Sequence, residues 1–116
     1  MPLDARTEIL PDRTAVVTIT GSMTAGTSLK LAEAQLQQAV AQEVQHLVLD
    51  LSGVDYADSA GLGLLVHTYG LMNRKGGILR LCGVQPRILS LLQMTKTDLI
   101  LPADSNREAS LAILKS

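Results

Sequence analysis

The chain carries at residues 46–63 the stretch HLVLDLSGVDYADSAGLG, in which an apolar run is followed by a turn and by the start of a second pattern. From Leu47 to Leu49 the side chains are apolar at odd and even positions alike, which is typical of a strand covered by helices on both faces of its sheet. From about Ser59 to Asn73 apolar residues recur at helical spacing. This predicted apolar stripe comprises Leu62, Leu65, Val66, Tyr69 and Met72.

Two strands and a helix are predicted on the N-terminal side of this stretch. β-branched residues at 14–20 favour a strand whose odd-numbered residues share one apolar face, and Gly21 ends it. A pattern of apolar residues separated by polar ones then predicts a helix from Leu29 to Val40. We also expect an edge strand near residues 5–10.

The C-terminal side continues the alternation. Residues 78–82 predict another inner strand, and residues 86–94 a helix, in which a proline suits the first turn because its missing N–H is not used there. Residues 99–101 are interpreted as a short strand. Ser105 and Glu108 have the spacing of a capping box, with the serine as the cap, and predict a final helix.

Strands and helices therefore alternate along the chain, which implies mostly parallel strands joined by right-handed crossovers. The length of 116 residues lies within the usual size of one domain, so we expect a single domain over residues 1–116. The predicted fold class is α/β, with an open, mostly parallel or mixed sheet of four to five strands and about four helices.

The composition excludes several classes of function. Ten Lys and Arg against eleven Asp and Glu give a formal net charge of −1, and the aromatic residues are Tyr56 and Tyr69 alone, so nucleic acid is not an expected partner. The apolar runs are too short to span a bilayer, and no signal-peptide pattern is seen. One cysteine and two histidines form no zinc motif. We expect a cytoplasmic protein with no metal, no cofactor and no direct membrane insertion.

The segment Asp58-Ser59-Ala60-Gly61-Leu62-Gly63 follows the central strand, where functional groups gather in open α/β sheets. Two glycines so near a helix start cost about 1 kcal/mol each relative to alanine. Their small size, with that of Ala60, would let another backbone approach, as a docking surface requires. Two purely structural explanations of this segment stay open. In the first, Asp58 or Ser59 serves only as the N-cap of the helix. In the second, the glycines serve only to let the helix pack closely on its sheet.

Ser59 is not placed for nucleophilic catalysis. A nucleophile elbow requires Gly-x-Ser-x-Gly and a positioned base, but residue 57 is alanine, His67 is eight residues away, and His46 begins the preceding strand at its opposite end. No phosphate-binding loop motif is present. Phosphorylation of Ser59 is compatible with this position, because a helix N-terminus favours a phosphate. The added charge of about −1.5 to −2 would repel an acidic or closely packed partner.

These residues resemble a known family. Residues 58–63 are similar to the phosphorylation-site motif of the STAS-domain anti-sigma-factor antagonists, the anti-anti-sigma proteins of bacterial partner switching. Residues 16–24 resemble the family's second strand and its turn into the first helix, and residues 47–51 its inner strand before the site. Residues 76–77 and 86–95 resemble the late strand and helix. The family often has an aspartate where this chain has Thr24, which can still cap a helix.

The resemblance implies a switch without catalytic activity of its own. An unphosphorylated antagonist binds an anti-sigma factor, which is also a serine kinase of the histidine-kinase-like ATPase fold, and so frees the sigma factor. The kinase uses ATP to phosphorylate the antagonist, here at Ser59, which ends binding, and a serine phosphatase resets the cycle. By this resemblance the docking surface comprises Asp58, Ser59, Ala60, Gly61, Leu62 and Gly63 with Gly21, Thr24 and Thr27 beside them. The alternative function is a stand-alone STAS subunit of a membrane lipid ABC transporter, since such domains share the fold.

Overall fold

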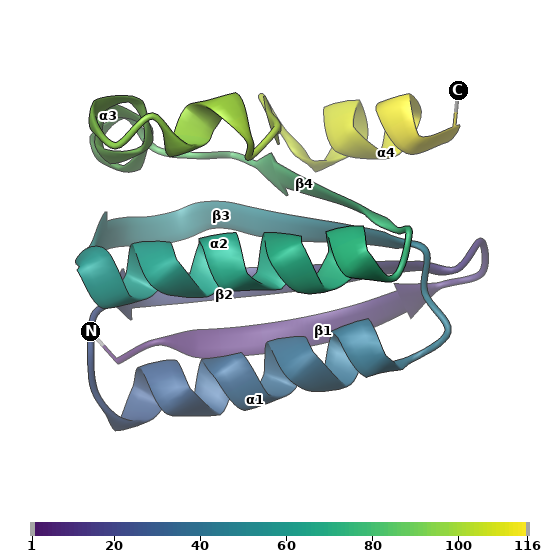
Figure 1. The fold of residues 1–116 in the computed structure, drawn as a ribbon, viewed down its shortest axis with the longest axis horizontal. Helices are drawn as coiled ribbons and strands as arrows, with labels where there is room; N and C mark the ends of the chain where they lie inside the picture. The colour runs from purple at the N-terminus through teal and green to yellow at the C-terminus, as the bar shows by residue number, and fades with distance from the viewer. Residues whose placement is uncertain (1, 116) are drawn as a thin grey trace.

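In the computed structural model, which describes residues 2–115, helices cover a central sheet (Figure 1). The strands lie in the order β1-β2-β3-β4-β5; β1 is antiparallel to β2, and the other neighbours are parallel. The strands are β1 Asp4–Leu10, β2 Thr14–Met23, β3 His46–Ala57, β4 Ile78–Cys82 and β5 Ala103–Asp104. The helices are α1 Thr27–Ala41, α2 Ser59–Arg74, α3 Pro86–Met94 and α4 Arg107–Lys115, with a short 3₁₀ helix, η1, at Thr97–Leu99. The predicted α/β fold and its edge strand are confirmed.

The two faces of the sheet bury different residues of the same strand. The larger apolar cluster contains Leu47 and Leu49 of β3 together with buried residues of α1 and α2, and α3 adds Ile88 and Leu92. The smaller cluster contains Val48 of β3 and packs against α4. These three β3 side chains are 0% exposed. The apolar run therefore belongs, as predicted, to a strand covered on both faces.

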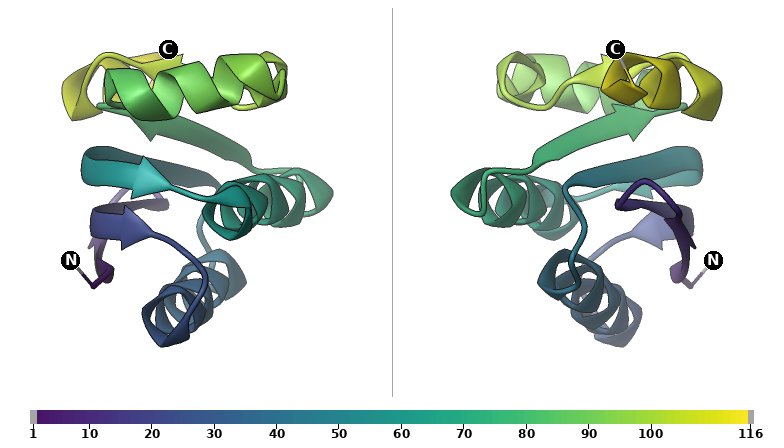
Figure 2. Two further views of the ribbon diagram at one scale, coloured as in Figure 1. Left: turned by 90° about the vertical axis from the view of Figure 1, so that its left-hand side faces the viewer. Right: turned by 90° about the vertical axis from the view of Figure 1, so that its right-hand side faces the viewer.

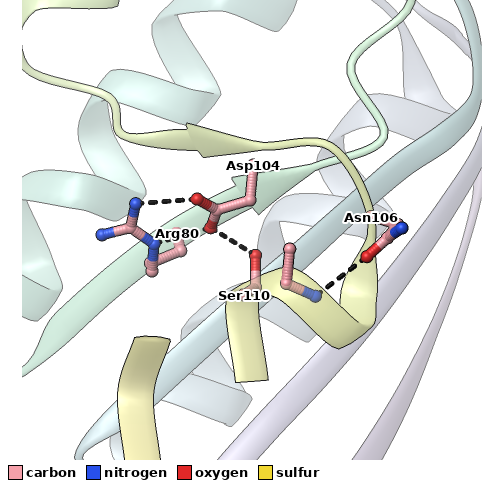
Figure 3. Close-up of polar contacts among 5 residues, drawn as sticks. Arg80, Asp104, Asn106 and Ser110 are labelled. Carbon is pink, nitrogen blue, oxygen red and sulfur yellow. Dashed lines mark hydrogen bonds and ion pairs between the residues drawn. The ribbon is translucent and has the colours of Figure 1, made fainter. Parts of the chain in front are cut away.

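Helix α4 is held on the sheet by polar contacts as well as apolar ones (Figure 3). The Arg80 guanidinium of β4 donates from Nε and Nη2 to the Asp104 carboxylate of β5 at 2.6 and 2.9 Å. The buried Ser110 hydroxyl of α4 donates to the same carboxylate at 2.6 Å. Arg107, the first residue of α4, donates to the Thr18 hydroxyl of β2 at 2.8 Å. These bonds tie α4 to β2 and β5 and, through Asp104, to β4.

The predicted strand at 99–101 is wrong. The amides of these three residues donate to carbonyls of the preceding turn, so they are not available to pair with β4. Lys96, with a φ of 60°, turns the chain directly after α3. Pairing with β4 begins only at Pro102, whose carbonyl accepts from the Leu81 amide at 2.8 Å, and the observed strand starts at Ala103.

Two predicted boundaries are also corrected. Gly21 does not end β2, which runs two residues further. Its φ of 104° suits glycine, and a side chain there would overlap the carbonyl oxygen of Pro2. The last helix is capped by Asn106 and not by Ser105, because the Asn106 side-chain oxygen accepts from the amide three residues on at 2.8 Å (Figure 3).

Candidate functional site

Strands β2 and β3 end next to each other, and α1 and α2 begin at that same end of the molecule (Figure 1, Figure 2). The last residues of the two strands, Met23 and Ala57, are paired. The turn before α1 therefore lies beside the start of α2. This arrangement places Thr24 and Thr27, in and just after that turn, near residues 58–63.

Asp58 fastens the turn before α1 to the start of α2. Its Oδ1 accepts from the amides of Ala60 and Gly61 at 2.9 and 3.0 Å, which makes Asp58 the N-cap of α2. Its Oδ2 accepts from the Ala25 amide at 2.9 Å. The hydrogen bond from Ala25, followed by that from Gly61, lowers the pKa of the Asp58 carboxyl below its usual value. Both oxygens of this ionised carboxylate are thus engaged within the chain.

Because Asp58 supplies the cap, the Ser59 side chain is not needed for it. Ser59 is the first residue of α2 and is exposed. Within the described range 2–115, its hydroxyl has no hydrogen-bond partner. A group attached to this oxygen would lie near the positive end of the α2 dipole. Of the two residues that the sequence offers as caps, Asp58 caps the helix and Ser59 is left with an exposed side chain.

Among the described residues no histidine or cysteine lies beside Ser59, and both oxygens of the neighbouring Asp58 carboxylate already accept from backbone amides. His67 is exposed further along α2, and His46 begins β3 at the end of that strand remote from the site. Cys82 is buried; its burial first, and the Asp50 carboxylate second, raise the pKa of the thiol to about 11. Over the same described range, no group of three or more His, Cys, Asp or Glu residues is arranged to hold a metal ion. The Ser59 hydroxyl is thus exposed, with no histidine, cysteine or metal-binding cluster beside it among the described residues.

The two glycines of the motif have different structural roles. A Cβ added at Gly61 would overlap the carbonyl oxygen of Met23, so the close packing of α2 on the end of β2 requires glycine there. A Cβ added at Gly63 would meet no atom of residues 2–115 within 4 Å. Ala60 is exposed, whereas Leu62 is half-buried against the larger cluster. The exposed residues of the motif are therefore all small, namely Ser59, Ala60 and Gly63.

Thr24, although threonine can cap a helix, does not cap α1. The helix begins at Thr27 and its N-cap is Gly26, with a φ of 147° and no capping hydrogen bond from a described side chain. Thr24 is half-buried and Thr27 is exposed. Gly21 lies inside β2, where it is buried and allows the Pro2 carbonyl to approach. Of these three predicted partner-binding residues, Thr27 is therefore the most accessible.

Two surface hollows flank the motif, and neither was predicted. One, of about 220 Å³, lies between α1 and α2. The other, of about 520 Å³, lies between the end of β3 and α3, and Tyr56, Leu91 and Met94 contribute to its lining. Met94, the last residue of α3, is 82% exposed, and an apolar residue at the end of a predicted helix is a sequence signal that could have pointed to this hollow. Each hollow is lined by elements that are distant from each other in the chain, so the spacing of residues along the sequence does not reveal it.

Comparison with known proteins identifies the family. The STAS domain family matches residues 6–109. The anti-sigma F factor antagonist of Paenibacillus polymyxa is 32% identical over 101 residues, which are 86% of this chain and 86% of that protein. None of the helices described between residues 2 and 115 has the length and apolar character needed to cross a membrane.

Solved structures share the fold. An anti-sigma factor antagonist from Mycobacterium paratuberculosis has a TM-score of 0.85 and 22% identity over 98% of this chain and 95% of its own. The Bacillus cell fate determinant SpoIIAA in its phosphorylated form has a TM-score of 0.74 and 17% identity over 95% of this chain and 99% of its own. These likenesses show the fold, and the family match and the P. polymyxa relative show that the chain belongs to the STAS-domain family of anti-sigma-factor antagonists.

Proposed function

We propose that this chain is the phosphorylatable antagonist of a bacterial partner switch. The unphosphorylated chain binds an anti-sigma factor, which is also a serine kinase of the histidine-kinase-like ATPase fold, and thereby frees a sigma factor. Phosphorylation at Ser59 ends the binding, and a serine phosphatase restores it. The observation that carries the proposal is the exposed hydroxyl of Ser59 at the N-terminus of α2. The description of the P. polymyxa relative as an anti-sigma factor antagonist supports the class of partner.

Phosphorylation here is a transfer between two proteins. The Ser59 hydroxyl oxygen attacks the γ-phosphorus of ATP, the bond from that phosphorus to the leaving oxygen of ADP breaks, and the serine proton passes to a base. Among the described residues, the neighbouring Asp58 carboxylate is engaged by backbone amides, and no histidine or cysteine lies beside Ser59. The kinase therefore supplies both the base and the ATP, and this chain is a substrate and a ligand.

A phosphate on Ser59 changes the surface and leaves the fold intact. It adds a charge of about −1.5 to −2 at neutral pH, next to the Asp58 carboxylate, which is also ionised. The α2 N-terminus favours this charge. A partner packed closely on the small side chains of Ala60 and Gly63 would have to bury both negative groups, which is costly without a matching cation. This cost is the reason that phosphorylation ends binding.

The phosphorylation site is tested by incubating the purified chain with each candidate serine kinase from the same genome and ATP, and mapping phosphate by mass spectrometry. We expect phosphate at Ser59 and none after Ser59→Ala. The matched control, Ser28→Ala, removes a half-buried serine in the first turn of α1 and should leave phosphorylation unchanged.

The effect on binding is tested with the same kinases. Ser59→Ala should remain bound, whereas Ser59→Asp should bind at least about tenfold more weakly, a loss of about 1.4 kcal/mol. The proposal fails if the chain binds no such kinase and acquires no phosphate at Ser59. Co-purification with a transporter ATPase, together with insensitivity to Ser59→Ala, would instead support the stand-alone subunit of a membrane lipid ABC transporter.

A further inference from the structure

The hollow between α1 and α2 begins within one helical turn of Ser59. Its apolar lining is Leu29 of α1 and Leu64 of α2, which are 9% and 6% exposed. Ala60 and Gly63 line its α2 side, and Gly63 lies four residues after Ser59, a rise of about 6 Å along the helix. The hollow is therefore continuous with the surface around the Ser59 hydroxyl.

The fold does not require the glycine that keeps this hollow open. Glycine in the interior of a helix lowers its stability relative to alanine. At Gly61 the backbone of Met23 excludes any side chain, whereas at Gly63 an added Cβ meets no atom of the described part of the chain within 4 Å. Stability alone would favour alanine at position 63. The absence of a side chain at position 63 therefore does not serve the stability of the free chain. It keeps the hollow open to a group from another molecule.

We propose that this hollow receives one apolar side chain of the anti-sigma factor that phosphorylates Ser59. The inference rests on the proposed function and adds a binding site to it. A stable protein interface covers about 800 Å² of each partner, which corresponds to a patch about 30 Å across. An interface that brings a kinase active site to Ser59 therefore extends over Gly63.

The size and chemistry of the hollow indicate its occupant. A volume of about 220 Å³ lies below the range of about 300–1,000 Å³ that is usual for small-molecule sites. The rim carries Lys30 and Glu33 of α1, whose opposite charges favour neither a cation nor an anion, with His67 of α2 also lining it. The apolar surface is supplied by the two leucines beneath. A leucine or methionine side chain from the kinase fits these features.

Three glycine substitutions in α2 test the inference. Gly63→Ala and Gly63→Leu place side chains in the open space of the hollow. The matched control is Gly70→Ala, about two turns further along the same helix, where an added Cβ would approach only the Arg74 guanidinium, at 3.5 Å. Affinity for the kinase that phosphorylates Ser59 is measured by calorimetry, and the thermal unfolding midpoint Tm by circular dichroism.

The inference predicts opposite changes in stability and binding. Gly63→Ala and Gly70→Ala should each raise Tm by about 3 to 6 °C, because alanine is the better helix former. Gly63→Leu should weaken kinase binding at least about tenfold, and Gly63→Ala should weaken it by a smaller factor. Gly70→Ala should bind like the unsubstituted chain.

A second measurement applies even if Gly63→Leu does not fold. A Gly63→Cys variant is alkylated in the free state and in the complex; the native Cys82 is buried and does not interfere. We expect the alkylation rate at position 63 to fall at least about tenfold when the kinase is bound.

Two outcomes separate this inference from the proposed function. If position 63 is alkylated equally fast in the complex, or if a folded Gly63→Leu binds normally while Ser59→Asp does not, the hollow lies outside the interface and the inference is wrong. If the unsubstituted chain binds no serine kinase, the proposed function fails and the inference with it.

Discussion

Replacing Asp104 tests how α4 is held on the sheet. The carboxylate accepts two hydrogen bonds from Arg80 and one from Ser110, and its side chain is only 7% exposed. In an Asp104→Ala variant the guanidinium loses its ion-pair partner and the buried Ser110 hydroxyl loses its acceptor. The Ser110 hydroxyl would stay fully buried without an acceptor, and the Arg80 guanidinium would stay mostly buried without its partner.

The expected cost follows from the burial of the pair. Hydrogen bonds to charged groups contribute about 1.5–3 kcal/mol, and removing one partner of a fully buried ion pair costs about 3–5 kcal/mol. The Arg80 side chain is 20% exposed, so water replaces part of the lost interaction and the lower range applies. We expect the free energy of unfolding to fall by about 2–3 kcal/mol, and Tm by roughly 10 °C.

Urea denaturation measures this loss, and Asp4→Ala is the control. The Arg6–Asp4 pair is 3.6 Å apart with side chains 86% and 63% exposed, so breaking it should change stability by no more than about 0.5 kcal/mol. The rate at which thiol reagents reach Cys82, which packs in the cluster under α4, should rise in Asp104→Ala.

The loss of stability in Asp104→Ala also depends on pH. The hydrogen bond from Arg80 lowers the pKa of the Asp104 carboxyl below its usual value. Because the folded pKa is lower than the unfolded one, the carboxylate stabilises the fold above about pH 4, and this contribution is lost as the pH falls below that value. The difference in the free energy of unfolding between the unsubstituted chain and Asp104→Ala should therefore become smaller in acid. A loss below about 0.5 kcal/mol at pH 7, or a difference that does not narrow in acid, would refute this account of α4.

Three further predictions concern the site and the core. Gly61→Ala should destabilise the chain by at least about 1 kcal/mol, because its methyl group overlaps the Met23 carbonyl; a higher urea midpoint would contradict this packing. Asp58→Ala should speed hydrogen exchange of the Ala25 and Gly61 amides, which lose their acceptor; unchanged exchange measured by NMR would exclude the shared cap. The Cys82 thiol, buried and with a pKa of about 11, should react with thiol reagents at pH 8 only after the chain opens, so rapid labelling of the native protein would contradict its burial.

The central strand and helix were predictable because burial leaves a direct pattern in the sequence. The helix expected from Ser59 to Asn73 runs from Ser59 to Arg74. Its buried face is nevertheless rotated relative to the predicted stripe, since Leu64 and Thr68 are buried while Leu62 is only half-buried. Thr68 is tolerated inside because its hydroxyl donates to the Leu64 carbonyl at 2.7 Å. A polar residue satisfied in this way cannot be recognised from hydrophobic spacing.

Other features depend on contacts between distant segments. Aspartate and serine are both good N-caps, and the sequence leaves open which one caps α2. The Asp58 carboxylate also accepts from the Ala25 amide, in a turn more than thirty residues away along the chain. The apolar residues at 99–101 resemble a strand, but hydroxyl bonds of Thr95 and Thr97 to the end of α3 stabilise a turn there instead. The hollow beside Gly63 exists only because α1 packs next to α2.

The most direct test of the central claim is the affinity of one serine kinase for the two forms of this chain. The kinase that phosphorylates Ser59 is titrated by calorimetry with the unphosphorylated chain, with the chain phosphorylated at Ser59, and with the latter after phosphatase treatment. The account predicts that phosphorylation weakens binding at least about tenfold and that the phosphatase restores it. Equal affinity for the phosphorylated and unphosphorylated forms would contradict the account.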